Sequence, residues 1–249
     1  MNKRTFIPVC ILASSLLSAC SQSQISGSLG ASQSLFQGYS ITKEELVAES
    51  KLSAKEMDKE ASVAPANSKY TKRLNKLTKN LTSYDGLTLN YKVYLADDVN
   101  AFAMPDGTVR VYSGLMDLMN DDEVVAVIGH EIGHVINEHT LYQYKKAYVT
   151  KAAKDGLSAV GGATGLVAGA YGDIGEQFLN AQFSQSDELE SDAYGVTLLH
   201  KVGRDPYAAA TAQEKLQKLG GTDSVFSSHP PSQKRIDLAR EAADKITGK

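Results

Sequence analysis

Residues 129–139 read G-H-E-I-G-H-V-I-N-E-H, and this stretch constrains the fold more than any other. A helix repeats every 3.6 residues, so His130 and His134 project from one face, one turn apart, with Glu131 beside them. Two imidazoles so placed can share a metal ion. H-E-x-x-H on a helix is typical of zinc hydrolases, in which the glutamate accepts the proton of a metal-activated water. A solvated surface pair of histidines is the alternative.

The residues around the motif predict a mostly buried helix. Apolar side chains recur at helical spacing from Asp121 to Glu138, and Asp121 and Asp122 suit a helix N-terminus. Burying two histidines without partners would cost about 1–3 kcal/mol per unsatisfied group, which a bound metal would offset. The setting therefore favours a metal site over a surface pair.

His139 is expected to point away from this site. It follows His134 by five residues, so on a continuous helix it is rotated by about 140° from the ligand face. The metzincin pattern H-E-x-x-H-x-x-G-x-x-H also fails, because Asn137 and Thr140 occupy its last two defined positions. The third ligand is therefore predicted to be remote in the sequence and to be a carboxylate.

A second predicted helix supplies that carboxylate. Residues 183–195 read F-S-Q-S-D-E-L-E-S-D-A-Y-G, and Ser184 or Ser186 can cap the helix. An acidic run is usually a solvated face, but Glu188 completes a set of two histidines, one carboxylate and a water. Asp192, one turn on, would hold a ligand histidine in the required tautomer, whereas Glu190 faces away. The apolar pattern predicts a packed side formed by Leu189, Ala193, Val196 and Leu199 or His200.

These motifs resemble the gluzincin zinc metallopeptidases of the HtpX and BepA type. H-E-I-G-H at residues 130–134 is followed by E-L-E-S-D at residues 188–192. Residues 100–115, N-A-F-A-M-P-D-G-T-V-R-V-Y-S-G-L, resemble the strand and turn that precede the zinc helix in that family. Residues 228–235, S-H-P-P-S-Q-K-R, resemble its C-terminal H-P-x-x-x-x-R element. The resemblance spans about residues 40–240.

The resemblance implies one zinc ion per chain, held by His130, His134 and Glu188, with Glu131 as general base. It also implies that His229 lies near the metal. There it either stabilises the oxyanion or takes the open position as a fourth ligand in a latent state. A loop histidine before two prolines is the alternative for His229.

A predicted hairpin offers a place for a substrate. Residues 101–104, A-F-A-M, a P-D-G turn and residues 108–112, T-V-R-V-Y, read as two strands. A peptide substrate would bind as an extended strand through main-chain hydrogen bonds. The edge that it would join is formed by Ala101, Phe102, Ala103 and Met104.

The remaining periodicities predict helices around a small sheet. Thr42 and Glu45 form a capping box for a first helix, residues 89–95 alternate as a strand, and Pro206 and Pro231 open later helices. A further helix is striped by Tyr70, Leu74, Leu77 and Leu81. The order predicts an α+β class. Together with the resemblance, it indicates a mainly helical, zincin-like metalloprotease domain over residues 41–249, with a small sheet or hairpin beside the H-E-x-x-H helix.

The N-terminus predicts a lipoprotein signal peptide over residues 1–19. Lys3 and Arg4 precede an apolar run, and residues 17–20, L-S-A-C, have the form of a lipobox. By resemblance to bacterial lipoproteins, Cys20 would be acylated after cleavage, and Ser21 points to the outer membrane, facing the periplasm. Residues 20–40 would then be a lipidated cysteine and a flexible tether. An ordinary signal or an uncleaved anchor is the alternative.

The net charge and a segment rich in small residues limit the kinds of partner and the kinds of structure that the chain can have. The formal net charge of −3 becomes −5 without Lys3 and Arg4, which excludes a nucleic-acid partner. The segment from Gly156 to Gly172 has small residues at four-residue spacing, as in packed membrane helices, but is barely long enough to span. A close-packed hairpin or a lid between the two ligand helices is the favoured interpretation.

Two classes of function remain open. The first is a zinc endopeptidase acting on misfolded or unassembled envelope proteins, with a partner in the outer-membrane assembly machinery; both the role and the partner are implied by resemblance alone. The second is a lipoprotein chaperone or assembly factor that has lost turnover. The intact Glu131 favours the first class. A zinc hydrolase of another bond is a third class, and a serine hydrolase has no support because G-x-S-x-G does not occur.

Overall fold

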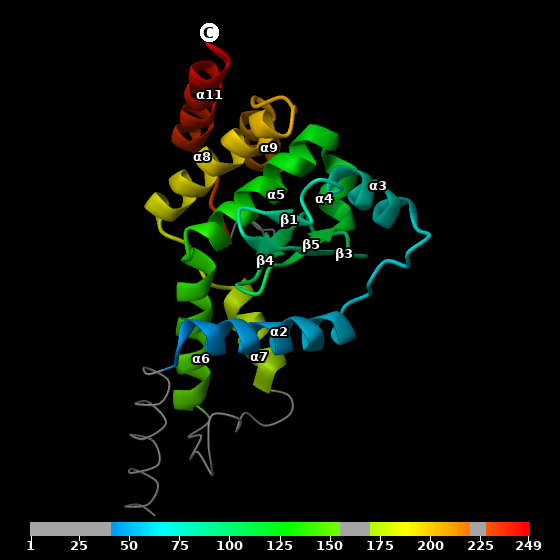
Figure 1. The fold of residues 1–249 in the computed structure, drawn as a ribbon, viewed down its shortest axis with the longest axis vertical. Helices are drawn as coiled ribbons and strands as arrows, with labels where there is room; N and C mark the ends of the chain where they lie inside the picture. The colour runs from blue at the N-terminus through cyan, green and yellow to red at the C-terminus, as the bar shows by residue number, and fades with distance from the viewer. Residues whose placement is uncertain (1–40, 155–169, 220–227) are drawn as a thin grey trace, which may run out of the picture.

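The computed structural model describes residues 41–154, 170–219 and 228–249 (Figure 1). The predicted signal peptide, Cys20, the tether and most of the Gly156–Gly172 segment lie outside this part of the chain. The strands are β1 Ser83–Tyr84, β2 Leu87–Thr88, β3 Asn90–Tyr94, β4 Ala101–Ala103 and β5 Thr108–Tyr112. The helices are α2 Lys43–Glu60, α3 Lys69–Leu77, α4 Ser113–Leu118, α5 Asp121–Ile136, α6 His139–Lys154, α7 Ala170–Leu179, α8 Gln185–Lys201, α9 Ala208–Leu219 and α11 Gln233–Thr247. The predicted α+β, mainly helical class is confirmed.

The central sheet has the strand order β3-β5-β4. The predicted hairpin is confirmed, because β4 pairs antiparallel with β5 around a turn in which Gly107 has a φ of 85°. A side chain at Gly107 would also meet the carbonyl oxygen of Thr88 at 2.2 Å. The strand β3 joins β5 in parallel, which leaves β4 at the edge of the described sheet.

The sheet lies between two groups of helices. Along β4, Ala101 and Ala103 pack into the core that contains α5, whereas Phe102 and Met104 pack into the core that contains α2, α6 and α7. This alternation follows from the two-residue period of a strand. Figure 1 shows α5 on one side of the sheet and α2 crossing the other side. Because both faces of β4 are buried, its position beside α5 is fixed.

The motif helix α5 begins where the sequence predicts. Asn120 caps it in a capping box with Glu123, directly before Asp121. The helix then packs closely against α8 through its glycines. A Cβ on Gly133 would lie 3.0 Å from the Cα of Ser191, and one on Gly129 would lie 3.1 Å from the Cα of Gly195. This close approach brings the histidine face of α5 against the acidic face of α8.

The helix α8 differs in part from its prediction. Ser184 is its N-cap, as expected, but Ala193 and His200 are exposed and do not form its packed side. Val196 and Leu199 are buried as predicted, and Ser191, Asp192 and Gly195 are buried with them. The apolar pattern misplaced part of the face because the small Ser191 and Gly195 lie against α5, and Asp192 is buried with Arg235 as its partner.

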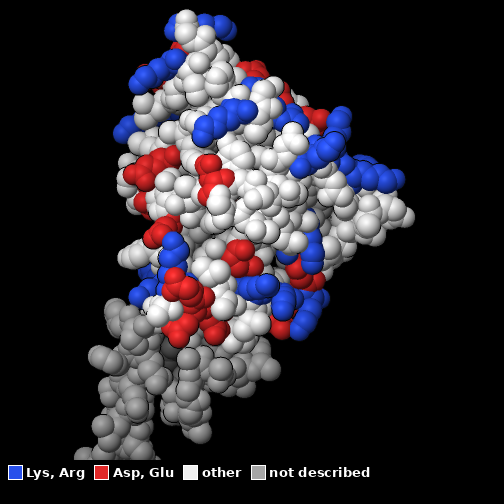
Figure 2. Space-filling model, in the orientation of Figure 1, with Lys and Arg blue, Asp and Glu red and all other residues white. Residues whose placement is uncertain are grey.

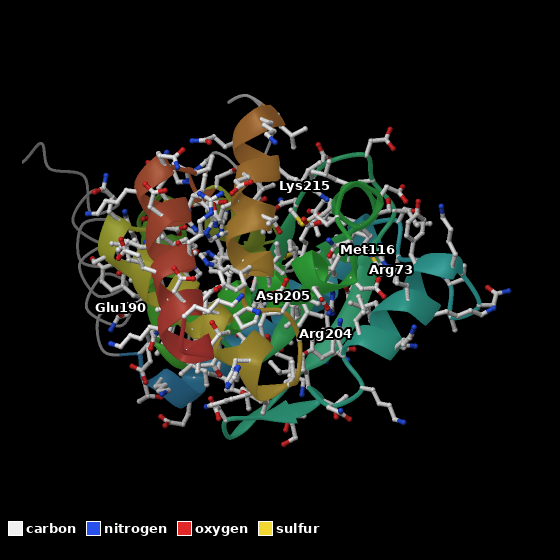
Figure 3. All side chains as sticks on the ribbon, turned by 90° about the horizontal axis from the view of Figure 1, so that it is seen from above. Arg73, Met116, Glu190, Arg204, Asp205 and Lys215 are labelled. Carbon is white, nitrogen blue, oxygen red and sulfur yellow. The ribbon has the colours of Figure 1, made fainter. Side chains whose placement is uncertain are left out.

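Long side chains tie the outer helices to this core. Arg73 of α3 donates to the main-chain oxygens of Met116 and Met119, and Lys215 of α9 lies 2.6 Å from Glu123 of α5 (Figure 3). On the face in Figure 2, basic and acidic side chains are interspersed around an uncharged central region. Within the described residues, none of the helices combines the length and apolar character needed to cross a membrane.

Candidate metal centre

Four buried side chains converge between α5, α8 and the segment that precedes α11. They are His130 and His134 from α5, Glu188 from α8 and His229, and their ligand atoms all lie within 4.8 Å of one another. Three of the four are the ligands that the sequence predicts. His229 joins them in the same cluster, as one of the two interpretations of that residue requires.

The distances in the cluster are close to those of a tetrahedral metal site. Zinc bonds of about 2.0–2.2 Å place two tetrahedral ligand atoms about 3.3–3.6 Å apart. The His130 Nε2 lies 3.1 Å from His134 Nε2 and 3.3 Å from His229 Nδ1. The Glu188 Oε1 lies 3.3 Å from His134 Nε2 and 2.8 Å from His229 Nδ1. The donor types and spacings therefore suit a zinc ion.

Asp192 and Arg235 contact the ligand residues on the side away from the point where the ligand atoms converge. Asp192 Oδ1 lies 2.9 Å from His130 Nδ1, as the tautomer argument predicts. Arg235 of α11 donates to both oxygens of Asp192, at 2.7 and 2.8 Å, and its Nη1 lies 2.5 Å from Glu188 Oε2. The sequence assigned no role to Arg235. Only its place in the H-P-x-x-x-x-R element signalled it.

The electrostatics of the cluster keep the ligand atoms of His134 and Glu188 free of protons. Burial disfavours the charged form of His229, but the carboxylates of Glu131 and Glu188 outweigh the effect of burial and raise the pKa of His229 instead. Burial holds the pKa of His134 well below its ordinary value, so its imidazole is neutral. Burial opposes ionisation of Glu188, but the neighbouring His229 and His134 hold its pKa far below the ordinary value. Burial likewise opposes ionisation of Asp192, yet hydrogen bonds from Arg235 and His130 lower its pKa to about 2. Neutral imidazoles and an ionised carboxylate are the forms that bind zinc.

Glu131 lies beside the cluster and beside the edge strand. Its side chain is 4% exposed, and burial raises its pKa despite the nearby His229 and His130. The backbone N–H of Ala103 donates to this carboxylate. Met104 N–H is used within the hairpin, so the alternation of an antiparallel pair directs Ala103 N–H to the free edge of β4. Glu131 therefore sits at the edge that the sequence predicts for substrate.

Two cavities adjoin Glu131 and His229. One lies along β4 and is bounded by Phe178, Leu179 and Phe183. The other is mainly apolar and runs between α5, α8 and α9, where Val127, Ala209, Ala212 and Leu216 form its walls. Phe183 also packs its ring against His134, with centroids 4.0 Å apart, and stacks on His229. The sequence alone identified neither the cavities nor Phe183.

His139 does not point away, so this part of the prediction was wrong. Its Nδ1 lies 3.1 Å from the Nδ1 of His134, although it is not one of the four clustered donors. The prediction assumed one continuous helix, but Glu138 has a φ of 61° and separates α5 from α6. This break turns the chain back and brings His139 behind His134.

Comparison with known proteins decides the family. The model described as Peptidase family M48 matches residues 68–243, which include all four clustered side chains and Glu131. The chain belongs to peptidase family M48. It is therefore a zinc metalloendopeptidase that acts on proteins.

Individual M48 relatives share much of the chain. Metalloprotease LoiP of Escherichia coli is 42% identical over 244 residues, which cover 96% of this chain and 97% of LoiP. Metalloprotease YcaL of E. coli is 46% identical over 190 residues, covering 75% of each chain. The Beta-barrel assembly-enhancing protease of E. coli is 30% identical over 162 residues, covering 60% of this chain and 33% of that protein. The predicted resemblance to the HtpX and BepA type is confirmed.

Proposed function

We propose that this M48 peptidase is an endopeptidase of the bacterial cell envelope that cleaves misfolded or unassembled proteins. The observation that carries the chemical part of the proposal is the convergence of His130, His134 and Glu188 beside the buried Glu131. Residues 41–249 form its peptidase domain, and residues 1–40 supply the signal, the lipidated Cys20 and a tether.

His130, His134 and Glu188 hold the zinc ion in this proposal. When bound, zinc lowers the pKa of water and polarises the carbonyl group to be cleaved. Glu131 accepts the proton from the attacking water and later delivers it to the leaving amine. Its raised pKa suits a group that must carry a proton between these steps. Asp192 keeps the Nδ1 proton on His130, so that Nε2 stays available.

His229 regulates access to the site in the same proposal. Its Nδ1 lies at ligand-like distances from His130 Nε2 and Glu188 Oε1, which supports a fourth-ligand role in a latent state. In the active state His229 leaves this position and stabilises the oxyanion, which contributes about 3 kcal/mol in related chemistry.

The substrate binds as an extended strand along Ala101–Met104. The free edge of β4 and the N–H of Ala103 next to Glu131 support this placement. Main-chain pairing tolerates many sequences, so side-chain pockets must provide selectivity. The apolar cavity beside Val127 and Ala209 would accept an aliphatic side chain next to the bond that is cleaved.

The envelope location rests on the N-terminal sequence. Lys3 and Arg4, the apolar run and L-S-A-C at residues 17–20 support export and acylation at Cys20, and Ser21 supports the outer membrane. The name of the Beta-barrel assembly-enhancing protease supports a partner in outer-membrane protein assembly. Labelling with a radioactive fatty acid tests the anchor, because Cys20→Ala should abolish incorporation.

Cleavage of unfolded casein tests the catalytic proposal. The wild-type chain should cleave casein, whereas chelator treatment or Glu131→Gln should stop cleavage. Equal cleavage by Glu131→Gln would overturn the role of the glutamate. A zinc-loaded wild type without activity would leave two cases, a latent enzyme or a chaperone. Activity that appears in His229→Ala identifies the latent enzyme.

A further inference from the structure

The two ligand histidines of α5 differ in the group that faces their Nδ1 atom. A histidine that binds a metal through one nitrogen usually donates the N–H of the other to a carboxylate or carbonyl group. His130 follows this rule, since its Nδ1 faces Asp192 at 2.9 Å. His134 does not, because its Nδ1 faces another imidazole nitrogen, the Nδ1 of His139, at 3.1 Å.

Only one arrangement of protons satisfies this contact and the metal site together. The Nε2 of His134 faces His130 Nε2 and Glu188 Oε1 and is therefore the nitrogen that would bind zinc. In the metal-bound site, the proton of His134 must then lie on Nδ1. The Nδ1 of His139 then accepts that proton, which places the His139 proton on Nε2. There, the Glu190 Oε2 lies 3.2 Å away and the Asp187 Oδ1 lies 3.7 Å away.

We propose that His139 is a positioning residue that fixes the tautomer and ring orientation of His134 for zinc. The chain of hydrogen bonds runs from His134 through His139 to the carboxylate of Glu190. This inference rests on the proposed role of His134 as a ligand.

The fold places His139 for this task. Glu138, with its positive φ, ends α5 and lets α6 begin at His139, whose side chain is only 10% exposed. Ser191 of α8 lies nearby, with its Oγ 3.5 Å from His139 Nδ1. At the other end of this series of hydrogen bonds, Glu190 lies on the periphery of the molecule, and its side chain is 62% exposed (Figure 3). His139 therefore links a buried ligand to a carboxylate at the surface.

Two nearly isosteric substitutions test the proposal on the full-length chain. His139→Leu removes the acceptor, whereas His139→Asn keeps an acceptor at the position of Nδ1. Zinc affinity is measured by competition with a fluorescent chelator. We expect His139→Leu to bind zinc about 10- to 100-fold more weakly and His139→Asn to stay close to wild type. His200→Leu is the control, because His200 is exposed in the last turn of α8.

Wild-type affinity in His139→Leu would overturn the proposal, and so would equal losses in the Leu and Asn variants. Thermal unfolding in excess chelator separates positioning from packing. We expect the metal-free variants to melt together, with only the zinc-induced rise in Tm reduced in His139→Leu. A lower Tm of metal-free His139→Leu without a lower affinity would assign His139 to packing. If His134→Ala also keeps full affinity, the proposed ligand set fails rather than the positioning role alone.

Discussion

Two clusters of buried charge lie on opposite faces of the sheet, and they are built differently. The metal centre gathers His130, His134, Glu188 and His229 against α5. On the other side, Asp58 of α2 binds Arg110 of β5, whose side chain is 2% exposed. Each contains a carboxylate near an arginine, and each would be expensive to bury without partners.

In the Asp58 cluster, both carboxylate oxygens accept from donors of the protein. Arg110 donates to both oxygens of Asp58, at 2.8 and 2.9 Å, and to the Asn90 carbonyl at 2.9 Å. Lys92 and Tyr94 complete the shell around Asp58 at 2.7 and 2.8 Å. Donors and acceptors therefore balance within the protein, and the cluster holds α2 against the sheet.

In the metal centre, atoms that can bind a metal converge on one point. The Nε2 atoms of His130 and His134 face each other and Glu188, while their Nδ1 atoms face Asp192 and His139. A cation at the point of convergence would balance these lone pairs. A buried cluster of converging ligand atoms therefore indicates a bound ion, whereas a carboxylate matched by donors of the protein indicates a structural role.

The largest expected effect is the loss of zinc and of activity when a ligand in the metal centre is removed, whereas changes in the Asp58 cluster should leave zinc in place. His134→Ala should abolish stoichiometric zinc and lower casein cleavage by at least about 10³-fold, since the metal contributes several kcal/mol to the transition state. Elemental analysis and the casein assay measure both. Retention of one zinc per chain would show that the convergence of these atoms does not identify the ligands.

Arg110→Met should act on stability alone. It leaves Asp58 buried without its main partner, which costs about 3–5 kcal/mol in the free energy of unfolding, measured with denaturant. Zinc content should be unchanged. The double variant Asp58→Leu with Arg110→Met should recover much of the loss, because no buried charge remains unpaired and the ammonium group of Lys92, whose side chain is 41% exposed, can reach water. Loss of zinc from the folded single variant would contradict a purely architectural role.

Ala209→Leu tests whether the cavity beside the metal centre selects the side chains of the substrate. The larger side chain fills part of this cavity, so cleavage next to bulky aliphatic residues should fall by about 10-fold relative to cleavage next to alanine. Peptide libraries analysed by mass spectrometry measure the ratio. An unchanged preference would exclude this cavity from substrate selection.

The smallest expected effect concerns pH. Burial would raise the pKa of Asp58, but hydrogen bonds from Arg110 and Lys92 outweigh it and hold the pKa below its ordinary value of 3.8. A lowered folded-state pKa stabilises the fold above the ordinary value and loses this contribution as pH falls towards the folded value. Wild type should therefore lose its stability advantage over the double variant below about pH 4. A constant advantage down to pH 3 would contradict the pairing.

Much of this site was predictable because its signals are local. Helical period and capping predicted α5 and the start of α8, and four-residue spacing placed His130 with His134 and Glu188 with Asp192. Alternation predicted the hairpin and its edge strand. Each of these inferences needs only the geometry inside one element.

The remaining features depend on how elements meet. The sequence by itself determined which residues could bind a metal, since spacing on a helix fixes their common face. Only the tertiary structure decided that Arg235 bridges Glu188 and Asp192, that β3 joins β5 in parallel, and that His139 returns to His134. The physical reason is that one left-handed residue at Glu138 redirects the chain, and packing, not periodicity, determines where it goes.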